Sequence, residues 1–577
     1  TEQGTGIVHC APSHGPDDFN LCLNNNIKAI ETVDGDGKYT DYVKLFSGIH
    51  IFKANPIVID KLKEQKNLLA NGELVHSYPH SWRSKAPLVH RATPQWFISM
   101  ESHDLRDKAL RAINETNFYP SKGKERLKSM IETRPDWCVS RQRVWGVPLP
   151  IFINKKTKEI LVDDEVIENI ASIYEKEGSD CWFLDDTQKF LGDKYNAQDY
   201  EKLRDIVEVW FDSGSTHSFV LEKREDLKWP ASMYLEGSDQ HRGWFHSSLL
   251  ESCGTRGRAP FESILSHGFV VDGKGLKMSK SLGNVIAPED ILKRYGADIL
   301  RIWVASSNYA EDLRIDYGIL EQHADSYRKI RNTFRYLLGN INDEFEEINL
   351  KRIDIKNLPE LEQLILHKIY KININFKKYF KNYDFHNLYK ELLNFCTVDL
   401  SAFYFDIRKD CLYCDPKNSK KRASVIFTLK IILDALLKWF APILSFTTEE
   451  INSLIGNKES IHLKLFNDYP NFFENNDLNS KWLELIKVRD ICNLSIEDKR
   501  TEKIIGSSLE ATLNVKLNKK YLSIVKDIDL AELCITSSYT LEETDKEEII
   551  VDAKKARGQK CPVCWKISLE PCPRHAN

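Results

Sequence analysis

Long hydrophobic runs are absent from this sequence of 577 residues. No apolar stretch approaches the roughly 18–20 residues that a helix needs to span a bilayer, so we expect no membrane association. No signal-like or transit-like segment follows Thr1. Because the first residue is threonine, we expect the sequence to begin within a longer protein.

The chain also lacks a large excess of charge of one sign, internal repeats and extended low-complexity linkers. The formal net charge is only −4, so the charge of the whole chain indicates no particular partner. The 13 cysteines are scattered through a large chain, which argues against a disulfide framework and for reduced thiols in the cytoplasm. The apolar content of 42% is typical of a globular protein, and the length predicts three or four domains.

Two kinds of hydrophobic pattern follow each other along the chain. Between residues 92 and about 308, short apolar runs alternate with helical patterns, which predicts an α/β sheet with crossover helices. After Asp316, apolar residues recur at helical spacing and predict a helical bundle, with helices over 324–338, 359–380, 385–404 and 423–440. Residues 326–440 contain 21 Lys and Arg against 14 Asp and Glu, a bias compatible with RNA binding.

A loop with two lysines is the most informative motif. Residues 277–281 read Lys-Met-Ser-Lys-Ser and are followed by Leu-Gly-Asn. Lysine binds phosphate as a point charge on a flexible stem, and small neighbours let the backbone approach a polyphosphate. A solvated basic loop would show the same lysine spacing, but the Met-Ser between the lysines favours a phosphate-binding loop.

A second candidate site lies about forty residues upstream. Residues 234–245 read Tyr-Leu-Glu-Gly-Ser-Asp-Gln-His-Arg-Gly-Trp-Phe, which predicts a strand, a polar turn and a helix. Nucleotides commonly bind at such a carboxyl end of a strand. Glu236 and Asp239 can accept hydrogen bonds from an amino group or ribose hydroxyls, and Gly237 permits close approach. The alternative is a helix cap with solvated charges.

Three further strings combine aromatic side chains with basic or polar groups. They occupy residues 92–97, 137–150 and 209–217. This composition suits stacking on a single-stranded RNA end and contact with its phosphates. Taken singly, their tryptophans could equally belong to the core.

The tail contains two pairs of residues at metal-ligand spacing, Cys561 with Cys564 and Cys572 with His575. Four such ligands predict one tetrahedral Zn²⁺ site. Cys411 and Cys414 have the same spacing, but no second pair stands nearby in the sequence. We interpret those two as structural thiols.

Together these motifs resemble the class I aminoacyl-tRNA synthetases, and within them the isoleucyl enzymes of the bacterial type. In that family the lysine loop stabilises the pyrophosphate leaving group while the amino acid is activated. The resemblance implies activation of isoleucine with ATP and Mg²⁺, transfer to tRNA(Ile), and a monomeric cytoplasmic enzyme. The tail of that family normally has four cysteines with a longer gap, so His575 would replace the fourth cysteine.

The resemblance also implies roles for single residues. Lys277 and Lys280 would be catalytic, and Lys280 with Met278 and Ser279 would bind ATP. Glu236, Gly237, Asp239 and Gln240 would bind the aminoacyl-adenylate. Trp96, Arg141 and Trp145 would contact tRNA.

Residues 4–19 resemble the end of the editing insertion of that family. One methylene changes the binding free energy in a hydrophobic pocket by only about 1–3 kcal/mol, and isoleucyl-tRNA synthetase is itself the standard example of this limit. A second, hydrolytic site removes mischarged valine. The resemblance implies that Asp18 and His9 act there, while the simple alternative for Asp17 and Asp18 is a helix N-cap.

The implied organisation has five parts. Residues 1–90 would contain the end of a β-rich editing domain and a return segment, and residues 91–317 would form the later half of a Rossmann-like α/β nucleotide-binding domain. Residues 318–480 would form the helical anticodon-binding domain, 481–555 a junction domain, and 556–577 the zinc-binding tail. No His-Ile-Gly-His string of this family occurs in the 577 residues, so we expect the chain alone to be inactive. A valine–tRNA ligase and a non-catalytic tRNA-binding derivative remain as alternatives.

Overall fold

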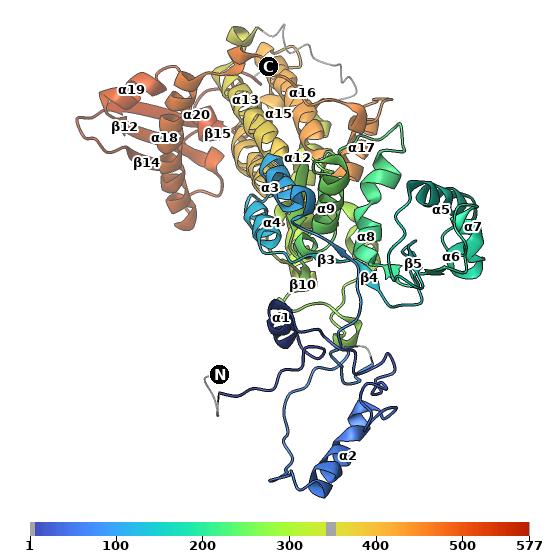
Figure 1. The fold of residues 1–577 in the computed structure, drawn as a ribbon. Coiled ribbons are helices and arrows are strands. Elements are labelled where there is room, and N and C mark those ends of the chain that lie inside the picture. The colour runs from blue at the N-terminus through green and yellow to red at the C-terminus, as the bar shows by residue number, and fades with distance from the viewer. Residues whose placement is uncertain (1–5, 83, 342–353, 576–577) are drawn as a thin grey trace. The chain divides into compact units, whose positions relative to one another are not determined.

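The computed structural model describes residues 6–82, 84–341 and 354–575. These residues form two compact units, each assembled from several stretches of sequence (Figure 1). Unit 1 contains the residues up to 114 with 128–230 and 242–260, and unit 2 contains 115–127, 231–241 and 261 onward. Parts of the predicted editing, anticodon-binding and tail regions, at 1–5, 83, 342–353 and 576–577, lie outside the described residues.

Helices and very short strands make up unit 1. Its helices are α1 (Pro16–Asn24), α2 (Ile51–Glu64), α3 (Leu105–Glu115), α5 (Asp164–Glu177), α6 (Cys181–Leu184), α7 (Thr187–Leu191), α8 (Val209–Gly214) and α9 (Trp244–Arg256), while α4 (Lys122–Glu132) spans the boundary between the units. Its antiparallel strand pairs are β1 (Phe97–Ile98) with β3 (Trp137–Cys138), β4 (Ser140–Arg141) with β7 (Ile206–Val207), and β5 (Phe152–Asn154) with β6 (Tyr200–Lys202).

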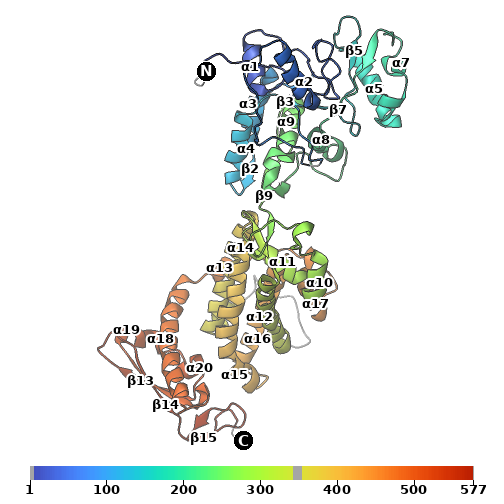
Figure 2. The same cartoon turned by 90° about the horizontal axis from the view of Figure 1, so that it is seen from below.

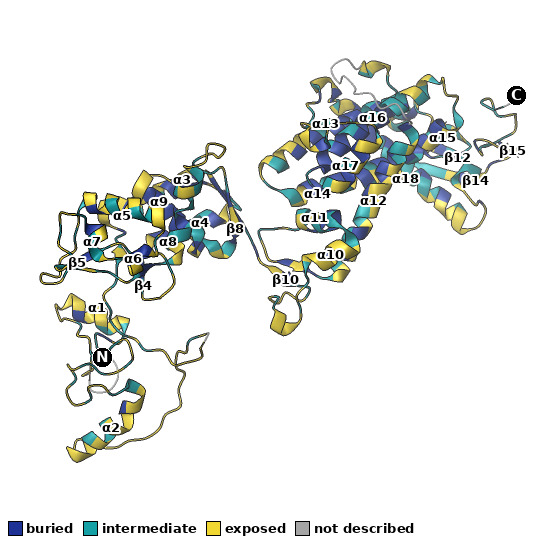
Figure 3. Cartoon of the chain, turned by 90° about the vertical axis from the view of Figure 1, so that its right-hand side faces the viewer, coloured by how far each residue is buried: buried dark blue, intermediate teal, exposed yellow. Residues whose placement is uncertain are grey.

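The first ninety residues are not β-rich where the structure describes them. They contain α1, α2 and isolated bridges such as Val33 with Tyr39. Residues 27–33 contain one isolated bridge, from Val33, and no named strand. Figure 3 shows that both helices are mostly exposed, and Ala54 is the only fully buried residue of α2. These described residues therefore contain little strand, and their place in a β-rich editing domain stays a prediction.

Residues 152–202 form a small module with its own core, which the sequence patterns did not reveal. Strands β5 and β6 and helices α5 to α7 surround Trp182, whose side chain is 1% exposed. The Trp182 indole donates a hydrogen bond to the carbonyl of Leu203 at 2.8 Å. The Lys202 ammonium donates to the carbonyls of Trp182 and Asp185 and faces the Trp182 ring. This module lies between the two aromatic strings at 137–150 and 209–217.

A parallel sheet in unit 2 confirms the predicted α/β pattern for three strands. The strands β2 (Asn117–Tyr119), β8 (Tyr234–Gly237) and β9 (Ser263–His267) lie in the order β2-β9-β8, and both pairings are parallel. Two more strands, β10 (Val270–Asp272) and β11 (Leu313–Ile315), form a separate parallel pair. Parallel neighbours align their carboxyl ends, so polar residues that follow them share one edge.

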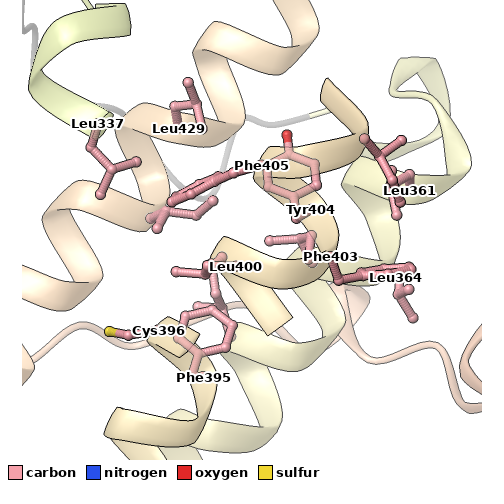
Figure 4. Packing of buried hydrophobic residues seen from close by; sticks show 14 of the residues in the cluster. Leu337, Leu361, Leu364, Phe395, Cys396, Leu400, Phe403, Tyr404, Phe405 and Leu429 are labelled. Carbon is pink, nitrogen blue, oxygen red and sulfur yellow. The ribbon is translucent and has the colours of Figure 1, made fainter. Parts of the chain in front are cut away.

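Long helices with a large apolar core form the middle of unit 2. They are α10 (Pro288–Tyr295), α11 (Ala297–Ser306), α12 (Tyr317–Ile341), α13 (Glu360–Lys381), α14 (Phe385–Asn394), a π-helical segment (Phe395–Phe405), α15 (Asp406–Cys414), α16 (Lys420–Phe440) and α17 (Ser445–Leu454). Figure 4 shows Phe395, Leu400 and Tyr404 from the π-helical segment in this core, which also contains Leu361 and Leu364 of α13. The predicted helical bundle is confirmed, except that 385–404 is an α-helix continued by a π-helix.

The last part of unit 2 combines one long helix with a small mixed sheet. Helix α18 (Asn476–Thr501) packs on β14, which belongs to the sheet β13-β12-β14 (Figure 2). The remaining elements are β12 (Ala511–Leu517), α19 (Lys519–Val525), α20 (Leu530–Leu533), β13 (Ser538–Glu543), β14 (Ile550–Lys555), β15 (Gln559–Lys560) and β16 (Ile567–Ser568). Among the described residues, no helix has both the length and the apolar character required to cross a membrane.

Candidate functional site

The lysine loop begins where strand β10 ends, and side chains close it at its base. The Asp272 carboxylate accepts hydrogen bonds from the backbone N–H groups of Lys274 and Leu276, at 3.0 and 2.8 Å. Its second oxygen accepts a bond from the Asn284 amide at 2.9 Å. The Asn284 oxygen accepts a bond from the backbone of Ser279, also at 2.9 Å. The loop therefore has a defined conformation although most of its side chains are exposed.

Both lysines of the motif point to solvent. Lys277 and Lys280 are exposed, and neither forms an ion pair within the described part of the chain. Met278 packs against a small apolar cluster that includes Ile291 and Leu320. Met278 thus anchors the loop, and the two cations remain available to an anion.

The predicted strand and polar turn are present at residues 234–242. Strand β8 carries Glu236, which is paired in register with Ser266, and a 3₁₀ turn of residues 238–242 follows. Glu236 and Asp239 are exposed, and Asp239 accepts a hydrogen bond from Gln240 at 2.9 Å. A Cβ atom on Gly237 would lie 2.6 Å from an Asp239 oxygen, so a larger residue here would displace that carboxylate. The two carboxylates lie at the carboxyl end of a parallel strand.

The three residues predicted to contact RNA have different environments. Trp145 is 93% exposed, as a stacking residue would be. Arg141 instead forms an ion pair with Glu208 at 2.9 Å and donates to the carbonyls of Cys138 and Ser140. Trp96 is half-buried, and its backbone N–H binds the Ser140 hydroxyl. The guanidinium of Arg141 is therefore already used within the fold.

A cavity of about 320 Å³ lies beside these residues in unit 1. Trp137, Trp210 and the arginines 134, 141 and 242 line it together with His246. His246 is buried, and neither of its ring nitrogens has a hydrogen-bond partner in the described structure. Burial, with smaller contributions from two arginines, lowers the pKa of His246 to about 3. Sequence patterns could not single out His246, because its surroundings come from distant segments.

Of the two predicted editing residues, His9 lies in the loop before helix α1, and Asp18 lies in the first turn of that helix. The Asp18 carboxylate accepts a hydrogen bond from the backbone of Ala11 at 2.8 Å. Helix α1 has Gly15 at its N-cap position and no side-chain cap, so the alternative of Asp18 as an N-cap is wrong. His9 is exposed, whereas His14 bonds to Thr32 at 2.6 Å and to the His90 carbonyl at 2.9 Å. The structure describes no contact between His9 and Asp18.

The tail brings its four predicted metal ligands together. The donor atoms of Cys561, Cys564, Cys572 and His575 all lie within 4.8 Å of one another. The Cys564 and Cys572 sulfurs are 3.7 Å apart, and the His575 Nδ1 atom is 3.5 and 3.3 Å from the sulfurs of Cys561 and Cys572. Ligands about 2.3 Å from a tetrahedral Zn²⁺ are separated by about 3.8 Å, so these spacings fit.

The thiol chemistry of the cluster also suits a metal. Hydrogen bonds from the backbone of Cys564 are the main reason that the pKa of Cys561 is lowered to about 6. A thiolate is the form that binds metal. By contrast, burial raises the pKa of Cys411 to about 12, which agrees with a structural thiol.

Two family models match the chain. Residues 21–316 match tRNA synthetases class I (I, L, M and V), which is just over half of the chain. Residues 362–517 match the anticodon-binding domain of tRNA ligase.

Curated relatives are similar along the whole chain. The isoleucine–tRNA ligase of Pelagibacter ubique (strain HTCC1062) is 76% identical over 578 residues, covering 100% of this chain and 64% of the relative. The isoleucine–tRNA ligase of Zymomonas mobilis subsp. mobilis (strain ATCC 31821 / ZM4 / CP4) is 45% identical, covering 98% and 62%. The chain thus spans less than two thirds of the length of these relatives.

Solved structures are less similar. Mycobacterium tuberculosis methionyl-tRNA synthetase in complex with methionyl-adenylate has 16% sequence identity and a TM-score of 0.47, covering 76% of this chain and 80% of that chain. A likeness at this level supports no conclusion by itself.

Proposed function

Because the chain belongs to the class I tRNA synthetases (I, L, M and V), we propose that it supplies the later part of an isoleucine–tRNA ligase. This part binds the phosphates of ATP, the aminoacyl-adenylate and tRNA(Ile). The observation that carries the proposal is the lysine loop, in which Asn284 and Asp272 fix the backbone while Lys277 and Lys280 form no ion pair with any described residue.

The charges of the loop suit the activation of an amino acid. When a carboxylate attacks the α-phosphate of ATP, negative charge develops on the pyrophosphate that leaves. Lys277 and Lys280 stabilise that charge, together with the Mg²⁺ that accompanies ATP. Glu236, Gly237, Asp239 and Gln240 at the end of β8 bind the adenylate through its amino group and ribose hydroxyls. Met278 and Ser279 hold the loop against the nucleotide.

The exposed Trp145 supports a contact with the tRNA acceptor end, where an unpaired base can stack on its ring. Trp96 and Arg141 contribute by shaping the same segment, since Arg141 is held by Glu208. The helical domain binds the tRNA body through its basic surface. The ligase acts as a monomer in the cytoplasm.

We also propose that Asp18 and His9 belong to a hydrolytic site that removes valine from mischarged tRNA. The Asp18 carboxylate uses one oxygen to bind the Ala11 backbone, which leaves the other for a substrate ammonium. His9 is exposed and can reach a hydroxyl or a water molecule.

Zn²⁺ is the metal that the donor set in the tail fits best, with three thiolates and one imidazole. When bound, it serves a structural role, because a site with four protein ligands has no open position for a substrate.

The test is a chimera in which these 577 residues replace the matching part of the Pelagibacter ubique ligase. We expect pyrophosphate exchange that depends on isoleucine and charging of tRNA(Ile). Exchange that depends on valine alone, with charging of tRNA(Val), would favour the valine–tRNA ligase. A folded chimera that binds tRNA but shows no exchange with any amino acid would favour the non-catalytic derivative.

A further inference from the structure

The tail contacts the end of helix α15 through the residue that completes its metal cluster. The His575 Nε2 atom lies 2.8 Å from the carbonyl oxygen of Cys414. Cys414 is the last residue of α15, and the last carbonyls of a helix have no partner within it. His575 therefore caps this helix from a position 161 residues further along the chain.

The neighbouring residue strengthens the same contact. Both terminal nitrogens of Arg574 donate to the Asp410 carboxylate, at 2.8 and 3.0 Å, and one of them also donates to Asp415 at 2.9 Å. A paired arrangement of this kind fixes orientation as well as charge. The Cys414 thiol faces the Val563 carbonyl at 3.8 Å, inside the loop that carries the first two ligands. Thus the His575 ring, the Arg574 guanidinium and the Cys414 thiol join the tail to the end of α15.

The two nitrogens of His575 connect the metal cluster to the helix. Its Nδ1 atom faces the sulfurs of Cys561 and Cys572, while Nε2 faces Cys414. A metal ion binds the lone pair of Nδ1, which leaves the ring proton on Nε2. Nε2 can then donate to the Cys414 carbonyl.

We propose that metal binding by the tail and docking of the tail on α15 are one coupled event, so that the metal acts as a latch between the tail and the helical domain. The inference rests on the proposed Zn²⁺ site and is independent of ligase activity. The tail also contacts the sheet β13-β12-β14, since the Ile567 backbone donates to the hydroxyl of Ser537, the residue before β13, at 2.7 Å. The latch thus joins the sheet β13-β12-β14 to α15.

Helix α15 is well placed to receive the latch. Its residue Arg408 forms ion pairs with Glu362 of α13 and with Glu532 of α20, each at 2.7 Å. One end of α15 is therefore fixed inside the helical core, and the other end is fixed by Arg574 and His575. Under this proposal, loss of the metal loosens the second end and leaves the Arg408 ion pairs unchanged.

The test compares Arg574→Gln with the parent 577-residue chain. Arg557→Gln is the matched control, because Arg557 is exposed, lies close in sequence and forms no ion pair in the described part of the chain. Zinc affinity is measured by competition with a chromogenic chelator. Hydrogen exchange is followed in peptides that cover residues 406–416 and 559–575.

We expect the parent to bind one Zn²⁺ and to lose protection in both peptides when the metal is removed. Arg574→Gln should still bind one Zn²⁺, with affinity reduced tenfold or more, since partners of metal ligands typically contribute 10- to 100-fold. It should leave residues 406–416 less protected even at saturating zinc. Arg557→Gln should match the parent. If Arg574→Gln does not fold, Asp410→Asn tests the same contact from the helix side.

Three results would overturn the inference. A parent chain without zinc would remove both the metal site and the latch. Zinc binding at parental affinity in both Arg574→Gln and Asp410→Asn would leave the metal site intact and refute the latch. Metal removal that changes exchange at 559–575 but not at 406–416 would also refute it.

Discussion

The Asn284 side chain bonds to Asp272 at 2.9 Å and to the backbone of Ser279 at the same distance, which joins the base of the lysine loop to its centre. The amide also reaches the Lys277 carbonyl at 3.3 Å. One side chain therefore holds the segment between the two lysines from both sides. This contact explains why an exposed loop with Gly273 and Gly275 has a defined conformation.

Replacing Asn284 with Ala should loosen the loop. We expect tryptic cleavage after Lys277 and Lys280 to become several-fold faster in the 577-residue chain, because a protease requires a locally opened segment. Asn20→Ala, at an exposed asparagine of helix α1, is the control. Cleavage of Asn284→Ala at the parental rate would mean that the amide does not hold the loop.

Removing the charge of Lys280 should slow amino-acid activation. In the chimera we expect Lys280→Ala to lower the rate of isoleucine-dependent exchange by about 10²–10³, the usual loss for a group that stabilises developing charge. The KM for isoleucine should change little, because Lys280 acts on the phosphates. Lys274→Ala, in the same loop but outside the motif, is the control. An unchanged exchange rate in Lys280→Ala would contradict the assignment.

Local sequence patterns predicted the structure well where the conformation of a segment depends mainly on its own residues. Apolar residues at helical spacing over 324–338 and 423–440 were enough to place α12 and α16, because a long amphipathic stripe has only one way to be buried. The four tail ligands were found by their spacing, since two turns of the chain bring them together.

Predictions failed where distant residues determine the conformation. The apolar run 207–211 is one of the short runs between residues 92 and about 308 that we expect to be strands, yet residues Val209–Gly214 form helix α8 after the short strand β7. Glu208, at the junction, is bound by the Trp137 indole at 2.7 Å and by Arg141 at 2.9 Å. These long-range bonds fix the turn between strand and helix, and tertiary contacts override weak strand propensity. The burial of His246 has the same origin.

The Glu251 carboxyl should make stability depend on pH. Burial, with a smaller contribution from the Asp212 carboxylate, raises the pKa of Glu251 from 4.5 to about 9. The unfolded state therefore loses its proton at lower pH than the folded state. The free energy of unfolding should fall as pH rises from about 5 to about 9, by at most about 1.4 kcal/mol per pH unit from this group.

Glu251→Gln should flatten that dependence, since an amide has no proton to lose. The measurement is urea unfolding at several pH values, with exposed Glu225→Gln as the control. An equal slope in Glu251→Gln and the parent would show that Glu251 titrates normally.

The last prediction concerns the ion pair that anchors α15 in the helical core. Arg408 binds both oxygens of Glu362 at 2.7 Å, and these side chains are only 4% and 0% exposed. Glu362 also accepts a bond from the buried Tyr404 hydroxyl at 3.1 Å. Arg408→Met removes the partner and leaves a carboxylate in the core, which typically costs about 3–5 kcal/mol. Urea unfolding should show this loss, while Arg500→Met, at an exposed pair, should change stability by less than about 1 kcal/mol. The double variant Arg408→Met with Glu362→Gln should recover part of the loss, because no unpaired charge then remains at Glu362. A double variant no more stable than Arg408→Met would show that packing of the arginine stem, and not the buried charge, determines the effect.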